Sequence, residues 1–343
     1  MFRKVIMGVT MKAVLMTCPG DTGVLKLQDI PKPKLNGAKE LLIKLKAAGI
    51  NPVDTKLRQR GTYYPDNLPC ILGCDGAGIV EEVGNEVNRF KSGDEVYFCH
   101  GGIGGHPGNY AQYGTVNESF TALKPKSIDF AHAAAAPLAM ITAWESLFDR
   151  ASLRDADKIL IHAGAGGVGH VAIQLAHIAG AEVATTVSTG DKARFVSSLG
   201  VEKVIYYKEQ DFAQEMLKWT EGEGLDYALD TVGGATLNKT FTAMKTYGDV
   251  VTLLQPPADC DWSLARNKNL RISMELMLTP MFKGLTNALQ HHAHILQRCA
   301  DHIDAGRLNI HVCDSYPLSE VAVAHQRLAE GDTIGKLVLT IPD

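Results

Sequence analysis

Paired cysteines, clusters of positive charge and long apolar segments are all missing from this chain of 343 residues. Its seven cysteines are scattered and never spaced as Cys-x-x-Cys, which favours reduced thiols and a cytoplasmic protein. The formal net charge of -4, without lysine- or arginine-rich tracts, argues against nucleic acid or a membrane surface as partner. The longest weakly polar segment, 131–144, is shorter than the ~20 residues that cross a bilayer.

Internal repeats, low-complexity tracts and a secretory signal are also missing. Residues 1–10 contain basic side chains but no sustained apolar core. Residues 11–15 read as the beginning of a first strand, so we interpret residues 1–10 as an extension or the product of an early start codon. The length suggests about two domains, and the apolar fraction of 45% is ample for large cores.

The first third of the chain is rich in short alternating strands. They are predicted at 12–16, 40–48, 78–83 and 94–99, between clusters of Gly, Pro, Asn and Asp. This spacing indicates a small, partly open barrel. Residues 101–109 are predicted to form a glycine-rich loop, and residues 131–147 a helix.

A Gly-x-Gly-x-x-Gly motif at Gly164, Gly166 and Gly169 follows the short apolar run 159–161. Apolar residues at helical spacing then predict a helix that ends at Gly180. The first glycine permits a tight turn, the second lets the backbone approach a pyrophosphate, and the third lets helix and strand pack closely. Unsatisfied N–H groups at the helix N-terminus would face the phosphates. We therefore predict dinucleotide binding by Gly164, Gly166, Gly167, Val168 and Gly169.

Strands and helices alternate from residue 158 to about residue 282. Further strands are predicted at 181–187, 203–207, 226–231, 249–254 and 270–278, and helices at 192–199, 212–220 and 236–244. This alternation predicts an α/β fold with a doubly wound parallel sheet. A long helix at 287–303 and an apolar strand at 335–340 follow, and the strand is expected to return to the first domain.

Several motifs coincide along most of the chain: AAGINPVDTK (47–56), LGCDGAGIV (72–80), FKSGDEV (90–96), PLAMITAW (137–144), the glycine loop and the terminal GKLVL. Together they resemble the medium-chain dehydrogenase/reductase superfamily, in its zinc-independent quinone oxidoreductase (zeta-crystallin-like) branch. The resemblance implies a GroES-like, partly open β-barrel catalytic domain from residues 1–136 and 283–343. It also implies a Rossmann domain from residues 137–282.

The resemblance further implies that no zinc is bound. Zinc-dependent members carry Cys at the position of Asn51 and His-Glu at the positions of Cys74 and Asp75. No counterpart of the third ligand lies near Met140, and the lobe that binds structural zinc is missing from 97–115. An alternative is an unorthodox metal site among Cys70, Cys74, Asp75, Cys99, His100 and His106, although this spacing fits no known template.

The end of the predicted strand 181–187 favours NADPH over NADH. NAD-specific domains usually place an acid here, against the adenosine ribose, whereas this chain has Ser188 and Thr189. Lys192, one helical turn further on, could neutralise a ribose phosphate. The resemblance aligns Tyr207 with a residue that flanks this phosphate in NADPH-dependent relatives. Asp191 disagrees with this assignment, and we interpret it as the cap of the following helix.

Without a metal, the reaction implied by the resemblance is hydride transfer from NADPH to a quinone or to an α,β-unsaturated carbonyl compound. Asn51 is the leading catalytic candidate, since its amide could fix the nicotinamide ribose or donate to a substrate oxygen; its alternative role is to cap a turn at Asn51-Pro52. Tyr64 and Lys56 are candidate substrate contacts, although Lys56 replaces a tyrosine of the relatives. The resemblance places Thr142, Leu253, Leu254 and Lys336 near the cofactor, and the charge of Lys336 argues against its full burial.

Other functions remain open at this point. The same fold supports reduction of enoyl thioesters, which a basic patch would favour, and a non-catalytic NADPH-binding sensor. A zinc-dependent alcohol dehydrogenase fits least. The partner is expected to be a small molecule. The predicted strand 270–278 could pair across a twofold axis, as in the family, to give a homodimer.

Overall fold

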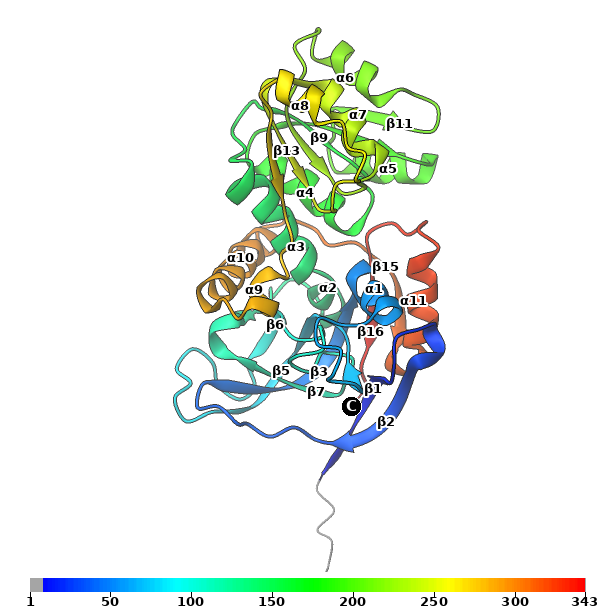
Figure 1. The fold of residues 1–343 in the computed structure, drawn as a ribbon. Coiled ribbons are helices and arrows are strands. Elements are labelled where there is room, and N and C mark those ends of the chain that lie inside the picture. Colours follow the sequence, from blue (N-terminus) through cyan, green and yellow to red (C-terminus); the bar gives the residue numbers. More distant parts are fainter. Residues whose placement is uncertain (1–8, 343) are drawn as a thin grey trace, which may run out of the picture. The chain divides into compact units, whose positions relative to one another are not determined.

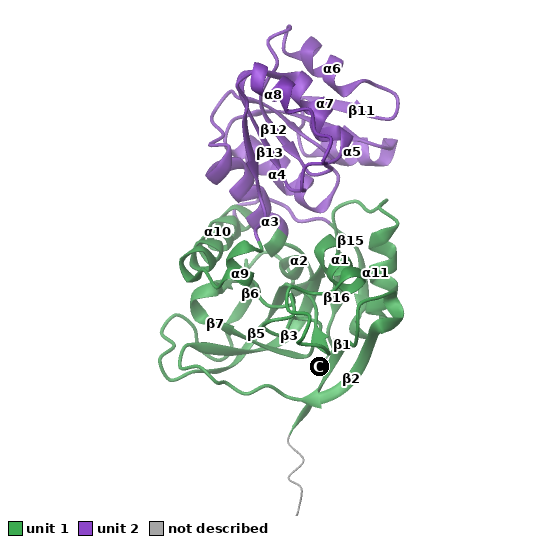
Figure 2. Ribbon diagram, in the orientation of Figure 1, with its two compact units in different colours: residues 1–138, 278–304, 312–343 green, residues 139–277, 305–311 purple. Residues whose placement is uncertain are grey.

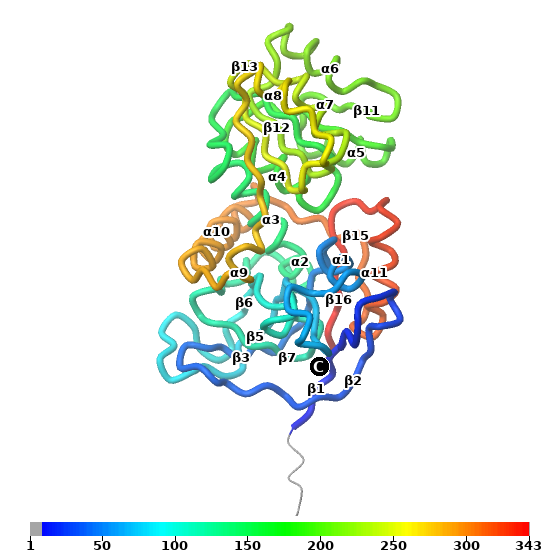
Figure 3. Tube along the Cα trace, viewed as in Figure 1, coloured from blue at the N-terminus to red at the C-terminus, as the bar shows by residue number. Residues whose placement is uncertain are grey.

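The computed structural model describes residues 9–342 and divides the chain into two compact units (Figure 2). Unit 1 comprises residues 1–138, 278–304 and 312–343, and unit 2 comprises residues 139–277 and 305–311. Unit 1 therefore contains segments from both halves of the chain (Figure 3). The interpretation of residues 1–10 as an extension concerns mainly residues 1–8, which lie outside the described residues.

Unit 1 is built on two sheets (Figure 1). A three-stranded sheet has the order β2-β1-β4, and a seven-stranded sheet has the order β15-β16-β3-β5-β6-β8, with β7 also paired to β3. The C-terminal strand β16 lies antiparallel to β3, so that Leu337 pairs with Ile50. The strands are β1 Thr10–Met16, β2 Leu25–Pro31, β3 Glu40–Ile50, β4 Cys70–Ile71, β5 Asp75–Val83, β6 Glu95–Cys99, β7 Tyr113–Asn117, β8 Ala122–Leu123, β15 Val312–Pro317 and β16 Lys336–Thr340.

Helix α1 (Pro52–Arg60) begins where the sequence suggested only a turn at Asn51-Pro52. Asn51 is its N-terminal flanking residue, Pro52 occupies the first helical position, and Gly61 ends it with φ 99°. Proline is well suited to the first position because its fixed φ is helical and no N–H is needed there. The other helices of unit 1 are α2 Phe130–Ala135, α9 Thr279–Lys283, α10 Thr286–Asp304 and α11 Val321–Ala329.

The prediction of a single helix over 131–147 is wrong. Helix α2 ends at Ala135, and a separate helix, α3, runs over Pro137–Trp144 and continues as a π-helical segment over Glu145–Arg150. Pro137 has no backbone N–H to donate to the preceding turn, and its ring clashes with the carbonyl group four residues earlier. The helix is therefore interrupted at this position. The unit boundary falls within α3, after Leu138.

Unit 2 holds a six-stranded parallel sheet with the order β11-β10-β9-β12-β13-β14. This order reverses direction between β9 and β12, as in doubly wound nucleotide-binding folds. Helices pack against the strands (Figure 1). The elements are β9 Lys158–Ile161, α4 Gly167–Ile178, β10 Glu182–Val187, α5 Gly190–Ser198, β11 Lys203–Tyr206, α6 Phe212–Trp219, β12 Leu225–Asp230, α7 Ala235–Ala243, β13 Met244–Thr252, α8 Trp262–Asn267 and β14 Arg271–Met274.

The last strand of this sheet is shorter than predicted, since β14 ends at Met274 rather than at Leu278. The core of the sheet is apolar and includes Leu160 of β9, Ala184 of β10 and Val250 of β13. Among residues 9–342, no helix is both long enough and apolar enough to cross a membrane.

Candidate active site

The glycine loop connects β9 to α4 at the carboxyl edge of the parallel sheet. A Cβ atom on Gly164 would lie 2.1 Å from Thr185 Oγ1, and one on Gly169 would lie 2.4 Å from the carbonyl oxygen of Ala163. Neither position can therefore carry a side chain without moving β10 or the loop. These two glycines are explained by packing.

Gly166 has a different reason to be glycine. The nearest atom to a Cβ placed there is the carbonyl oxygen of Ala163, at 3.2 Å, and Gly166 itself is half-exposed. It flanks the N-terminus of α4, whose next residues, Gly167 and Val168, are also half-exposed. The first N–H groups of a helix lack intrahelical acceptors and carry the positive end of its dipole. This accessible backbone fits the pyrophosphate of a dinucleotide.

Ser188, Lys192 and Tyr207 lie beyond the carboxyl ends of the neighbouring strands β10 and β11. The Tyr207 N–H donates to the carbonyl oxygen of Val187 (3.2 Å), which places Tyr207 beside Ser188. The Tyr207 side chain is 50% exposed. The three residues predicted to bind the ribose phosphate therefore share the edge that carries the glycine loop.

The interpretation of Asp191 as a helix cap is wrong. Thr189 caps α5, and its hydroxyl accepts from the backbone N–H of Lys192 at 3.4 Å. Asp191 lies in the first turn of the helix and its carboxylate contacts the Arg194 guanidinium. The negative charge of Asp191 is thus paired with an arginine on its own helix.

The loops after β12 and β13 complete this edge of the sheet. Asp230 organises them: its Oδ1 accepts the N–H groups of Val232 and Gly233 at 3.0 and 2.8 Å, and its Oδ2 accepts the Thr252 hydroxyl at 3.0 Å. The Leu253 N–H donates to the carbonyl oxygen of Asp230 (3.0 Å), and Leu254 follows. Sequence reasoning named Leu253 and Leu254 but not the carboxylate that holds their loop. Thr142, the other residue expected on this side, is buried in α3.

A second group of polar residues is buried in unit 1, where Asn51, Asp75 and Lys336 meet. Asn51 Nδ2 donates to Asp75 Oδ2 at 2.8 Å, and the Lys336 ammonium group contacts Asn51 Oδ1 and the carbonyl oxygen of Ile50. The expectation that Lys336 would escape full burial is wrong, since it is 5% exposed. Its charge is tolerated because Asp75 and Asp54 lie close to it, although burial still lowers the pKa of its ammonium group.

Asp54 belongs to the same group of buried residues. Its Oδ2 accepts the backbone N–H of Asn51 (2.8 Å) and the Tyr110 hydroxyl (3.0 Å), and that hydroxyl also lies 3.2 Å from His325 Nε2. Burial, together with the nearby charge of Asp75, raises the pKa of Asp54 to about 7. Burial lowers the pKa of His325 to about 3, so its imidazole is neutral. Sequence reasoning missed Tyr110 and His325.

The candidate substrate contacts are placed differently from one another. The Tyr64 hydroxyl donates to the carbonyl oxygen of Phe282 (3.2 Å), and the neighbouring Tyr63 ring stacks on the Phe282 ring with 4.8 Å between centroids. Tyr63 is 42% exposed, and the nearby Cys74 adds to burial in raising the pKa of its phenol. Lys56 lies exposed on α1, whereas Asp54 on the same helix is buried. The structure therefore does not bring Lys56 into the group around Asn51.

The buried donor set does not fit zinc. Zinc sites use thiolate, imidazole or carboxylate ligands, whereas here the Asn51 amide and the Asp75 carboxylate bind each other beside an ammonium group. The hydrogen bond with the Cys99 thiol lowers the pKa of the Cys74 thiol, but burial and the nearby carboxylates of Asp54 and Asp75 outweigh it and leave that pKa above its ordinary value. Within residues 9–342, no three His, Cys, Asp or Glu side chains converge as a metal would require. The alternative metal site around Cys74 is therefore not formed in the described chain.

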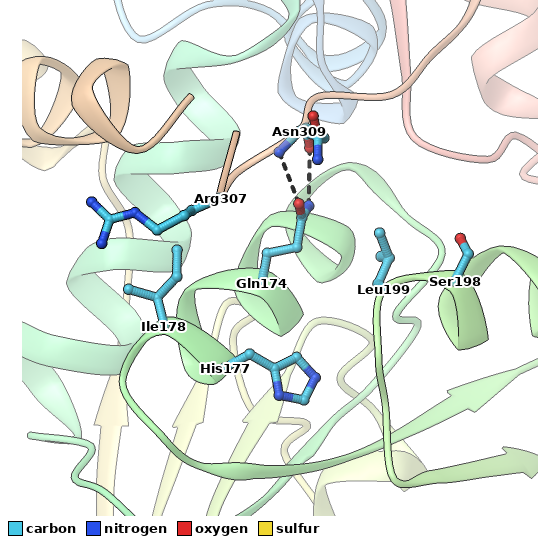
Figure 4. A pocket seen from close by; sticks show the side chains of 7 residues that line it. All are labelled: Gln174, His177, Ile178, Ser198, Leu199, Arg307 and Asn309. Carbon is cyan, nitrogen blue, oxygen red and sulfur yellow. Dashed lines mark hydrogen bonds between the residues drawn. The ribbon is translucent and has the colours of Figure 1, made fainter. Parts of the chain in front are cut away.

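Unit 2 also contains a pocket of about 340 Å³ that is separate from the glycine loop (Figure 4). It lies by the C-terminal ends of α4 and α5, whereas the loop adjoins the N-terminus of α4. Gln174 spans it to Asn309 by paired hydrogen bonds of 2.8 and 2.9 Å. Its lining residues are Gln174, His177, Ile178, Ser198, Leu199, Arg307 and Asn309.

A unit of two mainly antiparallel sheets, joined to a doubly wound unit with a dinucleotide loop, defines a nicotinamide-dependent oxidoreductase of the alcohol dehydrogenase type. Residues 37–126 match the alcohol dehydrogenase GroES-like domain, and residues 199–339 match the family described as zinc-binding dehydrogenase. The chain belongs to the medium-chain dehydrogenase/reductase superfamily, in the group that contains the quinone oxidoreductases.

Individual relatives span nearly the whole chain. A quinone oxidoreductase of Pseudomonas aeruginosa is 31% identical over 332 residues, covering 96% of this chain and 99% of that protein. An NADPH-dependent alkenal/one oxidoreductase of Arabidopsis thaliana is 34% identical over 342 residues, covering 96% and 79%. The solved quinone oxidoreductase of Coxiella burnetii superposes with a TM-score of 0.83 at 32% identity, covering 97% of this chain and 100% of that one.

Proposed function

We propose that the protein reduces quinones or α,β-unsaturated carbonyl compounds with NADPH, without zinc. One observation carries the proposal that the reaction needs no zinc. Asn51 stands where zinc-dependent members of the family have a cysteine ligand, and its amide contacts the Lys336 ammonium group. The relatives named as quinone and alkenal/one reductases support the substrate class. They favour this function over enoyl-thioester reduction and over a non-catalytic sensor.

The preference for NADPH rests on Ser188, Lys192 and Tyr207. No acid follows β10 directly to repel a ribose phosphate, and Asp191 is paired with Arg194. A lysine and an exposed tyrosine lie at the same edge of the sheet. The relative named as NADPH-dependent supports this preference.

The roles proposed for the chain's residues follow from their hydrogen bonds. NADPH, when bound, supplies the hydride, and Gly166, Gly167, Val168, Leu253 and Leu254 are proposed to hold it. The Asn51 amide has its carbonyl oxygen bonded to Lys336 and its nitrogen bonded to Asp75, so its orientation is fixed. Asn51 Nδ2 carries two N–H groups, and the second is proposed to bind the nicotinamide ribose or a substrate oxygen. Tyr64 and Lys56 remain proposed substrate contacts.

Purified protein is expected to oxidise NADPH, followed at 340 nm, with simple quinones or short enals as acceptors. Because no step needs a metal, turnover should be unchanged by a strong chelator. Chelator-sensitive turnover would show that the Cys74 and Asp75 region binds a metal after all. Tight NADPH binding without turnover on any acceptor would contradict the reductase proposal and favour the sensor.

We also propose a cytoplasmic homodimer. Strand β14 is one of the two edge strands of the parallel sheet; Met274 at its end is 67% exposed, and Leu276 just beyond it is 47% exposed. Unpaired backbone groups at an edge with exposed apolar side chains suit pairing with a second copy. Gel filtration with light scattering at micromolar concentration should give twice the chain mass of 37.0 kDa. A charged substitution, Met274→Lys, should then shift the mass toward the monomer, whereas a monomeric wild type would rule out this proposal.

A further inference from the structure

Asp54, Tyr110 and His325 form a buried hydrogen-bonded series, and the function proposed above assigns none of the three a role. The series runs from Asp54 Oδ2 to the Tyr110 hydroxyl (3.0 Å) and on to His325 Nε2 (3.2 Å). Asp54, Tyr110 and His325 are all 0% exposed. They come from α1, from the loop between β6 and β7, and from α11, so the series ties three distant parts of unit 1 together.

The Tyr110 ring has little freedom to move. A Cβ atom on Gly73 would lie 2.4 Å from the ring, so Gly73, with φ 93°, leaves the space that the ring fills. The His325 ring meets the Tyr110 ring edge-on, with 5.7 Å between centroids. The Tyr110 backbone is held as well, because its N–H donates to Leu72 O and its carbonyl accepts from the Val14 N–H. A hydroxyl fixed in this way can orient the carboxyl that it contacts.

Asp54 in turn holds the backbone of Asn51. The N–H of Asn51 donates to Asp54 Oδ2 at 2.8 Å, and the Asn51 amide continues to Asp75 and Lys336. Asp54 Oδ1 and His325 Nδ1 are buried without a hydrogen-bond partner. Both donors to Asp54 therefore converge on a single oxygen, and losing either one would leave the carboxylate poorly stabilised.

We propose that Tyr110 and His325 are positioning residues of the reaction: they fix the Asp54 carboxylate that orients Asn51 beside Asp75 and Lys336. This inference rests on the proposed function through Asn51. When Asp54 is ionised, the Tyr110 O–H donates to Asp54 Oδ2 and the His325 Nε2–H donates to the Tyr110 oxygen. When Asp54 takes up a proton, the Tyr110 O–H and the Asn51 N–H lose their charged acceptor, and both hydrogen bonds weaken. The ionised form thus holds Asn51 in the observed arrangement.

The charges around Asp54 determine where it titrates. Burial and the charge of Asp75 on β5 raise the pKa of Asp54, whereas the Asn51 N–H, the Tyr110 hydroxyl and Lys336 on β16 lower it. His325 is neutral near pH 7 and faces Arg58 of α1. Within the hydrogen-bonded series, Asp54 faces Tyr110, and Tyr110 faces His325. The other titratable or charged groups that face the series are Arg58, Cys74, Asp75 and Lys336. With the pKa of Asp54 at about 7, activity should rise with pH through neutrality.

The test compares Tyr110→Phe with Tyr97→Phe. Tyr97 is also buried in unit 1, but its hydroxyl donates to the carbonyl oxygen of Leu296 (2.5 Å), away from Asn51. Tyr110→Phe removes a donor to an ionised carboxylate, so we expect kcat to fall about tenfold. The midpoint of the pH profile should move to higher pH, because the lost hydrogen bond lowered the pKa of Asp54. Tyr97→Phe should leave the midpoint unchanged.

His325 is tested by two variants. The amide of His325→Gln can still donate to the Tyr110 oxygen, so this variant should retain most of kcat, whereas His325→Leu should resemble Tyr110→Phe. The pH dependence of the NADPH dissociation constant, measured by fluorescence, gives a second readout that requires no turnover. Inactive wild type would refute the proposed function and leave this readout intact. Identical pH dependence of NADPH binding in wild type and Tyr110→Phe, or equal effects of Tyr110→Phe and Tyr97→Phe, would overturn the inference.

Discussion

Lys336→Met is expected to destabilise the protein by about 3–5 kcal/mol, the cost of leaving buried charge without its partner. The ammonium group is the positive charge that faces both Asp54 and Asp75, and these three residues are 0–5% exposed. Methionine matches the length of the lysine stem but supplies no charge. The two carboxylates would then repel each other in a low-dielectric interior.

The pH dependence of this loss has a definite sign. A raised carboxyl pKa means that the folded state binds a proton more tightly than the unfolded state, so stability falls as pH rises from the ordinary pKa to the raised one. For Asp54 this window runs from 3.8 to about 7. Removing Lys336, which lowers the pKa of Asp54, extends the window upward. The destabilisation by Lys336→Met should therefore be larger at pH 8 than at pH 5.

Urea unfolding of the wild type and three variants isolates the effect. Lys12→Met is the matched control, because Lys12 pairs with Asp29 on the surface, where both side chains are more than half exposed, and should cost less than about 1 kcal/mol. Asp75→Asn combined with Lys336→Met should recover part of the loss, since it removes one of the stranded charges. If Lys336→Met is no more destabilising than Lys12→Met, Lys336 does not neutralise the buried carboxylates.

Local sequence signals were sufficient to predict the parallel sheet, but not the cluster of buried polar residues formed by Asn51, Asp54, Asp75, Tyr110, His325 and Lys336. The glycine loop, the apolar strands and the helix between them form within a short stretch, and the structure contains each of them. Helix α1 could also have been predicted from local signals in place of a turn, because Pro52 suits the first helical position and Gly61 suits the end of a helix. Pro137 similarly marked the break between α2 and α3.

The cluster itself depends on contacts between distant segments. Tyr110 lies 56 residues from Asp54 and 215 residues from His325 along the chain, and neither occupies a motif that links it to Asn51. The burial of Lys336 was opposite to expectation, because charge normally keeps a lysine at the surface. Only the pairing of β16 with β3, which brings Lys336 beside Ile50 and Asn51, makes the burial possible. Sequence periodicity carries no information on that pairing.

Ser188→Asp is expected to raise the KM for NADPH about 100-fold, because a carboxylate facing the proposed ribose phosphate adds a like-charge contact worth several kcal/mol. NADH should be affected little or should bind better, since an acid at this point suits the free ribose hydroxyls. Ser188 directly follows β10, and Tyr207 lies beside it at the end of β11. The ratio of kcat/KM for the two cofactors is the quantity to measure.

Ser198→Asp controls for the added charge. Ser198 is exposed at the far end of α5, so the same substitution changes the net charge equally but lies one helix length from Ser188. It should leave the ratio of kcat/KM for NADPH and NADH unchanged. Lys192→Met should lower that ratio in the same direction as Ser188→Asp, by about tenfold, because it removes one charge-assisted contact. If Ser188→Asp and Lys192→Met both leave the ratio at its wild-type value, the ribose phosphate does not bind at the ends of β10 and β11, and the preference for NADPH must be abandoned.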